Sequence, residues 1–214
     1  MNIKHIHIKQ LSSFFDSATV VKKKRERTVY HYEDLYIKVW VPNWTQGDIT
    51  KYCVDSGYYD ESNASALQSL IYDESGQRGY ITNAGQSVGS SWKQFSEKTN
   101  VEDRKEFMKS ILANAILTNG IYSDLFPTNF VFSNRLSLID FDSFSSFTFL
   151  FDKKKQPYEK FDLNAWWKPH ETAVRDVNKF YRAYFETLGL KLDFSIDSVD
   201  DVQRMISLLD SSSR

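Results

Sequence analysis

The side chains most suited to chemistry lie between residues 120 and 142. Asp124 stands five positions before Asn129, and Asp140 follows eleven positions after Asn129, at the end of an apolar run. Phosphoryl transfer to a hydroxyl group needs residues of these types: a carboxylate near the hydroxyl group, and an amide oxygen with a second carboxylate to hold magnesium against the phosphates. Magnesium prefers such hard oxygen ligands and keeps part of its water shell. The spacing therefore indicates a phosphoryl-transfer site.

Two short segments resemble motifs of one superfamily. The sequence D-L-F-P-T-N at residues 124–129 resembles the catalytic loop D-x-x-x-x-N of protein-kinase-like phosphotransferases. The sequence I-D-F-D at residues 139–142 resembles their metal-binding strand end, which reads D-F-G in protein kinases. The I-D-F-D form is more similar to that of the small-molecule and lipopolysaccharide-type kinases. The resemblance covers roughly residues 28–142, and its clear motifs lie at 120–142.

The resemblance implies a role for each of these polar residues. Asp124 is expected to be the catalytic base, Asn129 and Asp140 the magnesium ligands, and Asp142 an auxiliary ligand. The alternative is structural: Asp124 and Asn129 would stabilise a turn, and Asp140 would cap the next segment. Finding both motifs in the correct order behind a capped helix favours the functional interpretation.

The superfamily also places a lysine on a strand to hold the nucleotide phosphates. Lys38 is the only cation in the apolar run 35–40, where this lysine is expected. Alternatively, Lys38 points to solvent from an alternating strand. Its expected partner is a glutamate on the following helix, for which Glu61 is the first candidate and Asp60 the second.

The cofactors implied by the resemblance are ATP and Mg²⁺. The nucleotide base is expected against the connector at residues 80–85, with Tyr80 and Thr82 among its contacts. The expected function is transfer of the γ-phosphate to a hydroxyl-bearing acceptor, either a small molecule or a protein. The sequence does not identify this acceptor, the oligomeric state or the biological role.

Some features depart from the superfamily pattern. No glycine precedes Gly47, although a glycine-rich loop normally separates the first two strands. Instead, residues 22–27 contain five cations. One interpretation is that they bind phosphates by charge, and the alternatives are a solvated hairpin turn and contact with nucleic acid. Tyr122 replaces the usual histidine, and no A-P-E sequence follows Asp142. These departures leave two alternatives open: a pseudokinase that acts as a binding or scaffold module, and a kinase-like nucleotidyl transferase.

The elements that must position these residues are strands in the first half of the chain and helices in the second. The expected strands and hairpins are residues 3–8, 28–32 paired with 35–40, 79–82 after a turn at 75–76, 130–132 and 136–139. The expected helices are residues 60–70, 100–120, 171–188 and 199–209. This order predicts an α+β protein-kinase-like fold with a β-rich N-terminal lobe at 1–83 and a reduced helical C-terminal lobe at 84–214.

Composition narrows the remaining classes. The chain has 27 Lys and Arg against 28 Asp and Glu, a net charge of -1, so its overall charge does not indicate a nucleic-acid partner. A single cysteine, Cys53, fits a reducing compartment, and neither a signal peptide nor an apolar membrane span is evident. We expect a cytoplasmic protein. His5 and His7 have no third ligand nearby for zinc. Trp166 and Trp167 are expected in the core rather than in a substrate platform.

Overall fold

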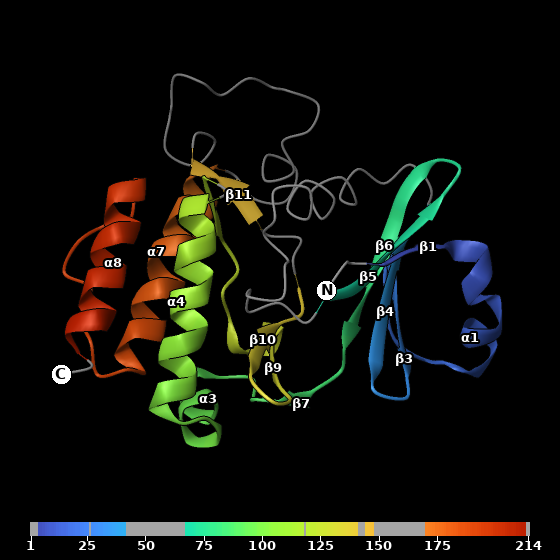
Figure 1. Ribbon diagram of the computed structural model, residues 1–214, viewed down its shortest axis with the longest axis horizontal. Helices are drawn as coiled ribbons and strands as arrows, with labels where there is room; N and C mark the ends of the chain where they lie inside the picture. Colours follow the sequence, from blue (N-terminus) through green and yellow to red (C-terminus); the bar gives the residue numbers. More distant parts are fainter. Residues whose placement is uncertain are drawn as a thin grey trace.

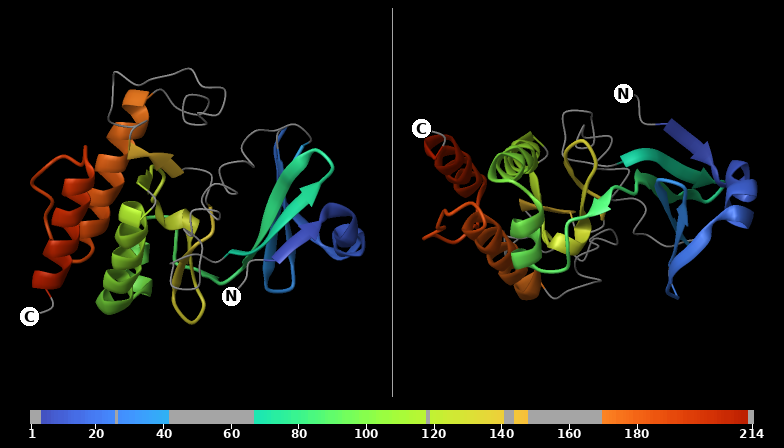
Figure 2. Two further views of the ribbon diagram at one scale, coloured as in Figure 1. Left: turned by 45° about the horizontal axis from the view of Figure 1, so that its top comes forward. Right: turned by 90° about the horizontal axis from the view of Figure 1, so that it is seen from below.

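The computed structural model describes residues 4–25, 27–41, 67–117, 119–140, 144–147 and 170–212. A large β-sheet lies at one end of the molecule and a group of helices at the other (Figures 1 and 2). The architecture is mixed α+β. Within the described ranges, no helix is both long and apolar enough to cross a bilayer.

The large sheet contains six strands. They are β1 Lys4–His7, β2 Thr19–Lys23, β3 Arg27–Tyr32, β4 Leu35–Trp40, β5 Leu67–Asp73 and β6 Gly76–Asn83. Their spatial order is β1-β5-β6-β4-β3-β2, which places β4 and β6 at the centre. The pairings are antiparallel except that β1 runs parallel to β5. We refer to this sheet and the short helices on it as the sheet lobe.

Both predicted hairpins of the sheet lobe are confirmed. The β3–β4 hairpin turns at Glu33 and Asp34, and Glu33 has a positive φ of 52°. The β5–β6 hairpin turns just before Gly76, whose φ of 116° suits a residue without a Cβ. Asp73 closes this turn by accepting hydrogen bonds from the backbone N–H and hydroxyl of Ser75.

The predicted helix at residues 60–70 is wrong where it can be compared with the structure. Leu67 and Leu70 lie on strand β5, and residues 60–66 fall outside the described ranges. The i, i+3 spacing of the two leucines was interpreted as a helical face. A register irregularity between Leu67 and Ser69 produces the same spacing on a strand. Because Leu70 and Ile71 are both fully buried, on opposite faces, the strand also lacks the usual alternation.

The two faces of the sheet have different partners. Ile37, Ile71 and Ile81 pack with Leu11 on the face covered by the 3₁₀ turn η1, Ile8–Leu11, and helix α1, Ser12–Ser17. Side chains from the other face, including Trp40 and Tyr80, belong to a large core that continues into the helices. The second face of the sheet is therefore the one that meets the rest of the molecule.

Four described helices form the other end of the molecule. They are α3 Trp92–Lys98, α4 Val101–Leu117, α7 His170–Glu186 and α8 Val199–Ser211. The last three confirm the predicted helices, and Asn100 caps α4 by accepting a 2.8 Å hydrogen bond from the backbone N–H of Asp103. Helix α3 was not predicted. Trp92 and Phe95 from α3 pack against Tyr184 of α7, so α3 belongs to the aromatic core.

Short strands connect the sheet lobe to the helices. Strands β7 Gln86–Ser87, β9 Phe130–Phe132 and β10 Leu136–Leu138 form one small sheet. Strand β8, Gly120–Tyr122, follows α4 and pairs with β11, Phe144–Ser146. Residues 123–129 therefore leave one small sheet and enter the other, in the space between the helices and the sheet lobe (Figure 1).

Candidate functional site

The first part of the site is strand β4, at the centre of the large sheet. Alternation along β4 turns Ile37 and Val39 toward α1, so Lys38 and Trp40 face the helices. Lys38 pairs with Val29 on β3 and Tyr80 on β6, and the residue is 7% exposed. A lysine with neighbouring strands on both sides is fixed in position. Its burial argues against the alternative in which it points to solvent.

The second part is the loop between β8 and β9, which ends in the 3₁₀ turn η2, Pro127–Asn129. The Asn129 side chain closes this loop, because its Nδ2 donates a 2.9 Å hydrogen bond to the backbone oxygen of Asp124. The backbone oxygen of Asn129 accepts a 3.0 Å hydrogen bond from the N–H of Ile139. The loop is therefore connected directly to the strand end that carries Asp140.

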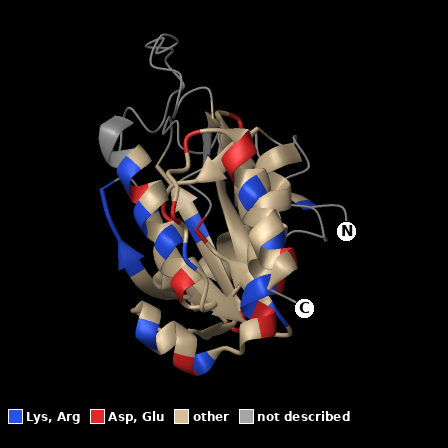
Figure 3. Ribbon diagram, turned by 90° about the vertical axis from the view of Figure 1, so that its left-hand side faces the viewer, with Lys and Arg blue, Asp and Glu red and all other residues tan. Residues whose placement is uncertain are grey.

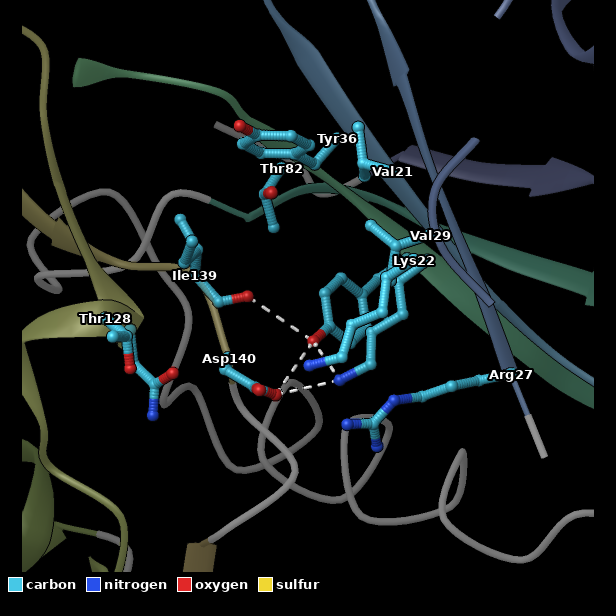
Figure 4. A pocket seen from close by; sticks show the side chains of 12 residues that line it. Val21, Lys22, Arg27, Val29, Tyr36, Thr82, Thr128, Ile139 and Asp140 are labelled. Atoms are coloured by element: carbon cyan, nitrogen blue, oxygen red, sulfur yellow. Dashed lines mark hydrogen bonds and ion pairs between the residues drawn. The ribbon is translucent and has the colours of Figure 1, made fainter. Parts of the chain in front are cut away.

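The two parts meet at Asp140. Lys38 Nζ lies 2.8 Å from Asp140 Oδ1, forming an ion pair between residues 102 positions apart in the chain. The Tyr80 hydroxyl group accepts a 3.1 Å hydrogen bond from Lys38 Nζ and lies 3.4 Å from the Ile139 backbone oxygen (Figure 4). Tyr80 thus contacts both the central lysine and the segment that carries the carboxylate.

These residues line a cavity of about 340 Å³. Its described lining residues come from strands β2, β3, β4 and β6 of the sheet lobe and from η2 and the end of β10: Val21, Lys22, Arg27, Val29, Tyr36, Lys38, Tyr80, Thr82, Thr128, Asn129, Ile139 and Asp140. A cavity of this size can hold a small organic ligand.

The cavity is less polar at one end than at the other. Tyr36, Thr82 and Val21 lie together at one end, whereas Lys22, Arg27 and Asp140 lie at the opposite end (Figure 4). A ligand that fits both ends has an uncharged, flat or apolar part and an anionic part. The cavity is therefore suited to an amphiphilic ligand whose charge is concentrated at one end.

Asp140 is held in its charged form. Burial alone would raise the pKa of its carboxyl group, but the charge and hydrogen bond of Lys38, together with the charges of Arg27 and Lys22, lower that pKa to about 2. The Asp140 side chain is 35% exposed and the Lys38 side chain 8%. Asp140 is therefore an ionised carboxylate that a ligand from the cavity can reach.

The oxygen atoms of Asn129 and Asp140 fit a magnesium ion better than a softer metal. Among the described residues, no three His, Cys, Asp or Glu side chains gather into a preformed metal site. Magnesium does not need one, because it is commonly held by one or two carboxylates, substrate phosphates and water. Asn129 and Asp140 line one cavity, as such a site requires.

Five of the predicted site residues come together in this cavity: Lys38, Tyr80, Thr82, Asn129 and Asp140. Asp124 lies at the start of the same loop but is absent from the described residues that line the cavity. Glu61, its competitor Asp60, and Asp142 fall outside the described ranges, as do Cys53 and the Trp166–Trp167 pair.

His5 and His7 lie away from the cavity and contact residues of the sheet lobe. The His5 ring stacks on Tyr72, with the ring centroids 5.1 Å apart. His7 Nδ1 accepts a hydrogen bond from the N–H of Lys9, and its Nε2 lies 3.6 Å from Glu74. Both histidines therefore belong to the outer edge of the sheet lobe.

Sequence reasoning missed several lining residues. Tyr36 lies two positions before Lys38 on β4, so strand alternation gave a usable signal for it. Val29 pairs directly with Lys38 from β3, which only the register of the hairpin reveals. The contact between the Tyr80 hydroxyl group and Lys38 depends on the pairing of β4 with β6, and no local pattern indicates it.

Comparison with models of known protein families finds no match, and none of the curated protein sequences compared is significantly similar to this chain.

Proposed function

We propose that the chain is an ATP- and magnesium-dependent phosphotransferase with a protein-kinase-like, two-lobed fold, divided near residue 83 into lobes 1–83 and 84–214. The observation that carries the proposal is the convergence of Lys38, Asn129 and Asp140 on one cavity, with Lys38 Nζ 2.8 Å from Asp140. Lys38 comes from the sheet lobe, and Asn129 and Asp140 come from the segments that connect this lobe to the helices. A lysine facing a carboxylate and an amide is the arrangement that phosphoryl transfer uses in protein kinases.

The position of Lys38 along the chain also supports the proposal. Strands β2, β3 and β4 are three consecutive antiparallel strands, and Lys38 lies on the third. Protein kinases carry their phosphate-binding lysine on the third strand of the N-terminal lobe, a position that β4 matches when the edge strand β1 is left out of the count. Strand β6 ends at Asn83, which is compatible with the proposed division near residue 83.

The cavity suggests how the nucleotide lies. The base and ribose would occupy the less polar end near Tyr36 and Thr82, and the phosphates would point toward Lys38 and Asp140. Tyr80 then contacts the phosphate end rather than the base, since its hydroxyl group bonds to Lys38. We therefore propose that Thr82 contacts the base, as the sequence suggested, and that Tyr80 lies near the phosphates instead.

In the proposed reaction, the hydroxyl oxygen of the acceptor attacks the γ-phosphorus, and the bond from this phosphorus to the β–γ bridging oxygen breaks. ADP leaves, and the proton of the acceptor hydroxyl group passes to the carboxylate of Asp124. Lys38 neutralises phosphate charge, while Asn129 and Asp140 would hold the magnesium ion, which would offset charge on the phosphate oxygens.

The test is phosphate release or transfer from γ-labelled ATP by the wild-type chain and by Asp124→Ala. We expect the variant to lose at least about a hundredfold in rate, the lower range for removal of a general base. Asp193→Ala is the matched control, because Asp193 is an exposed carboxylate in the segment before α8. Equal activity of the wild-type and Asp124→Ala proteins would contradict the assigned role.

A binding module without turnover is the second candidate. It is favoured by the position of Asp124, which is absent from the described cavity lining, and by the direct bond from Lys38 to Asp140. For such a module, ATP would raise the melting temperature, but neither wild type nor Asp124→Ala would transfer phosphate. Parallel assays with α-labelled ATP test the third alternative, nucleotidyl transfer, since only that reaction leaves the α-label on the acceptor.

A further inference from the structure

The hairpin formed by β2 and β3 directs cationic side chains into the cavity. The pairing of the two strands shifts between Val20 and Lys22, so that Val20 pairs with Tyr30 and Lys22 pairs with Val29. Such a bulge turns two successive side chains toward one face of a strand. It explains why Val21 and Lys22 both line the cavity, although alternation in a regular strand would separate them.

Arg27 enters the same cavity from the next strand. It is the first residue of β3, pairs with Trp40 on β4, and is only 7% exposed. Its backbone oxygen accepts a 2.8 Å hydrogen bond from the N–H of Lys24, which closes the hairpin loop. The side chains of Arg27 and Lys22 both extend toward Asp140 (Figure 4).

The described residues at the charged end of the cavity are mostly cations. Among its described lining residues, Lys22, Arg27 and Lys38 are cations and Asp140 is the carboxylate. These three cations line the space that a bound ligand would occupy, and an anion with several negative charges can bond to more than one of them.

The helices at the other end of the molecule carry a mixture of charges. On the helical face of the molecule, Lys and Arg alternate with Asp and Glu along the helices (Figure 3). This mixture agrees with the overall charge of -1. The cations that line the cavity occupy a space whose size suits a small polyanion rather than a nucleic-acid strand.

We infer that Lys22 and Arg27 form a phosphate-binding pair on the β2–β3 hairpin, which holds the polyphosphate of the bound nucleotide through side-chain cations. The inference rests on the proposed function. Glycine-rich loops bind phosphates through backbone amides that no side chain obstructs, and this hairpin contains no glycine. Arg27 supplies a planar group that can bond to two phosphate oxygens, and Lys22 adds a flexible point charge at the cavity mouth.

The test compares adjacent lysines of β2. Lys22 lines the cavity and Lys23 does not, although both are exposed residues on the same strand. We would measure the dissociation constants of adenosine, AMP, ATP and inorganic tripolyphosphate by calorimetry with magnesium present. For Lys22→Ala, ATP and tripolyphosphate are expected to bind about tenfold more weakly, the loss of one charge-assisted hydrogen bond. Adenosine affinity should be unchanged, and Lys23→Ala should bind every ligand as the wild type does.

Arg27 needs a milder substitution because it is buried. Arg27→Lys keeps the charge and removes the planar fork, so ATP should bind more weakly while the melting temperature of the ligand-free protein changes little. Raising the salt concentration should weaken ATP binding less in Lys22→Ala than in Lys23→Ala. The Lys22→Ala protein has lost one ionic contact with the phosphates, so salt has fewer contacts to screen.

The possible results separate this inference from the proposed function. If the wild type binds ATP but Lys22→Ala and Lys23→Ala are equal, the phosphate pair is wrong and the nucleotide site stands. A second result is that tripolyphosphate binds through Lys22, adenosine does not bind, and ATP binds no more tightly than tripolyphosphate. The phosphate pair then stands and the nucleotide proposal fails. Binding of neither ATP nor tripolyphosphate contradicts both.

Discussion

The hydroxyl group of Tyr80 is a single atom that contacts both sides of the site. It accepts a hydrogen bond from Lys38 Nζ at 3.1 Å and lies 3.5 Å from Asp140 Oδ1. The Tyr80 and Trp40 rings also lie 5.3 and 5.6 Å from Lys38 Nζ, near enough for cation–π attraction. Lys38 is thus held by an aromatic pair as well as by its carboxylate partner.

Tyr80→Phe tests whether this hydroxyl group positions Lys38. The variant keeps the ring, and we expect a loss of about 1 kcal/mol in the free energy of unfolding from one buried hydrogen bond. If Tyr80 positions Lys38, the rate of phosphate transfer should fall about tenfold with little change in the KM for ATP, because a displaced group affects the transition state most. Steady-state kinetics and urea unfolding provide both quantities.

Tyr36→Phe is the matched control for Tyr80→Phe. It removes a hydroxyl group from the same cavity, at the end opposite Asp140. Its rate of transfer should stay near that of the wild type. Equal rate losses in the two variants would mean that the hydroxyl group of Tyr80 has no special relation to Lys38.

The low pKa of Asp140 leads to a prediction about acid stability. Its pKa of about 2 lies below the ordinary value of 3.8, so the folded protein binds this proton more weakly than the unfolded chain does. The carboxylate therefore stabilises the fold above the ordinary pKa, and this contribution is lost as the pH falls from about 4 to about 2. In Asp140→Asn, the free energy of unfolding should fall less over this pH range than in the wild type.

Urea unfolding at several pH values measures this difference. Asp193→Asn, which alters an exposed carboxylate, serves as the control and should follow the wild-type curve. If the Asp140→Asn and wild-type curves remain parallel down to about pH 2, the ion pair with Lys38 does not contribute to stability in solution.

At the residue scale, the sequence predicted the residues whose types are chemically distinctive. Lys38, Asn129 and Asp140 could be located because each is a polar residue at the end or middle of an apolar run. Val29 has no such signature, since β-branched residues are common in any strand, and for Tyr36 the only signal is its alternation with Lys38 on β4. The contact of the Tyr80 hydroxyl group depends on which strands are neighbours, and the sequence does not state this order.

At the level of elements, the close approach of β4 and β6 depends on Gly79. A Cβ built on Gly79 would collide with the backbone oxygen of Lys38 on the facing strand. Gly79→Ala should therefore push β6 away from β4 at the position of Lys38. We expect a loss of about 1–3 kcal/mol in the free energy of unfolding, the usual range for overpacking, and weaker ATP binding.

The decisive comparison for Gly79 is with a substitution that destabilises β6 away from Lys38. Ile81→Val removes a methylene group from the opposite face, against α1, and should cost about 1 kcal/mol without affecting ATP binding. If Gly79→Ala binds ATP as tightly as Ile81→Val does, the spacing of β4 and β6 does not control the site.

Helices and hairpins with a strong local signal were predicted. Strands β2 and β5 were harder to predict, because one is exposed on both faces and the other is buried on both faces. Helix α4 has a cap at Asn100 and a repeated apolar face, and the β3–β4 hairpin has a clear turn. Strand β2, in contrast, is exposed along its whole length, with Val20 and Val21 about half exposed, so it shows no alternation. Strand β5 is buried on both faces, and its first residues, 67–70, were predicted to end a helix because of the i, i+3 spacing of Leu67 and Leu70.

For the molecule as a whole, the sheet and the helices share a core. Trp40, Leu70 and Tyr80 of the sheet lobe belong to the same buried cluster as Met108 of α4 and Tyr184 of α7. The order of strands before helices predicted two lobes. The two parts share one core because residues far apart in the sequence pack together. The parallel pairing of β1 with β5, 65 residues apart at Lys4 and Ser69, is another such contact. These depend on the whole chain and have no local signal.

Because the sheet lobe and the rest of the molecule share a core and a cavity, the stabilisation of the fold by a bound ligand tests whether the two parts unfold together. The cavity is lined from β2, β3, β4 and β6 on one side and from residues 128–140 on the other, so a bound nucleotide contacts both parts. ATP with magnesium at about a hundred times its dissociation constant should stabilise the fold by about 2.7 kcal/mol, and unfolding should remain a single transition. Lys38→Met should also unfold in one transition, but ATP should stabilise it only slightly. Lys93→Met, on the exposed side of α3, should be stabilised by ATP as much as the wild type is.

Circular dichroism and tryptophan fluorescence, recorded over the same thermal ramp, measure the number of transitions and the stabilisation by ATP. Two separated transitions in the wild type would show that the core does not couple the sheet to the helices, and an equal gain in Lys38→Met would show that ATP binds elsewhere.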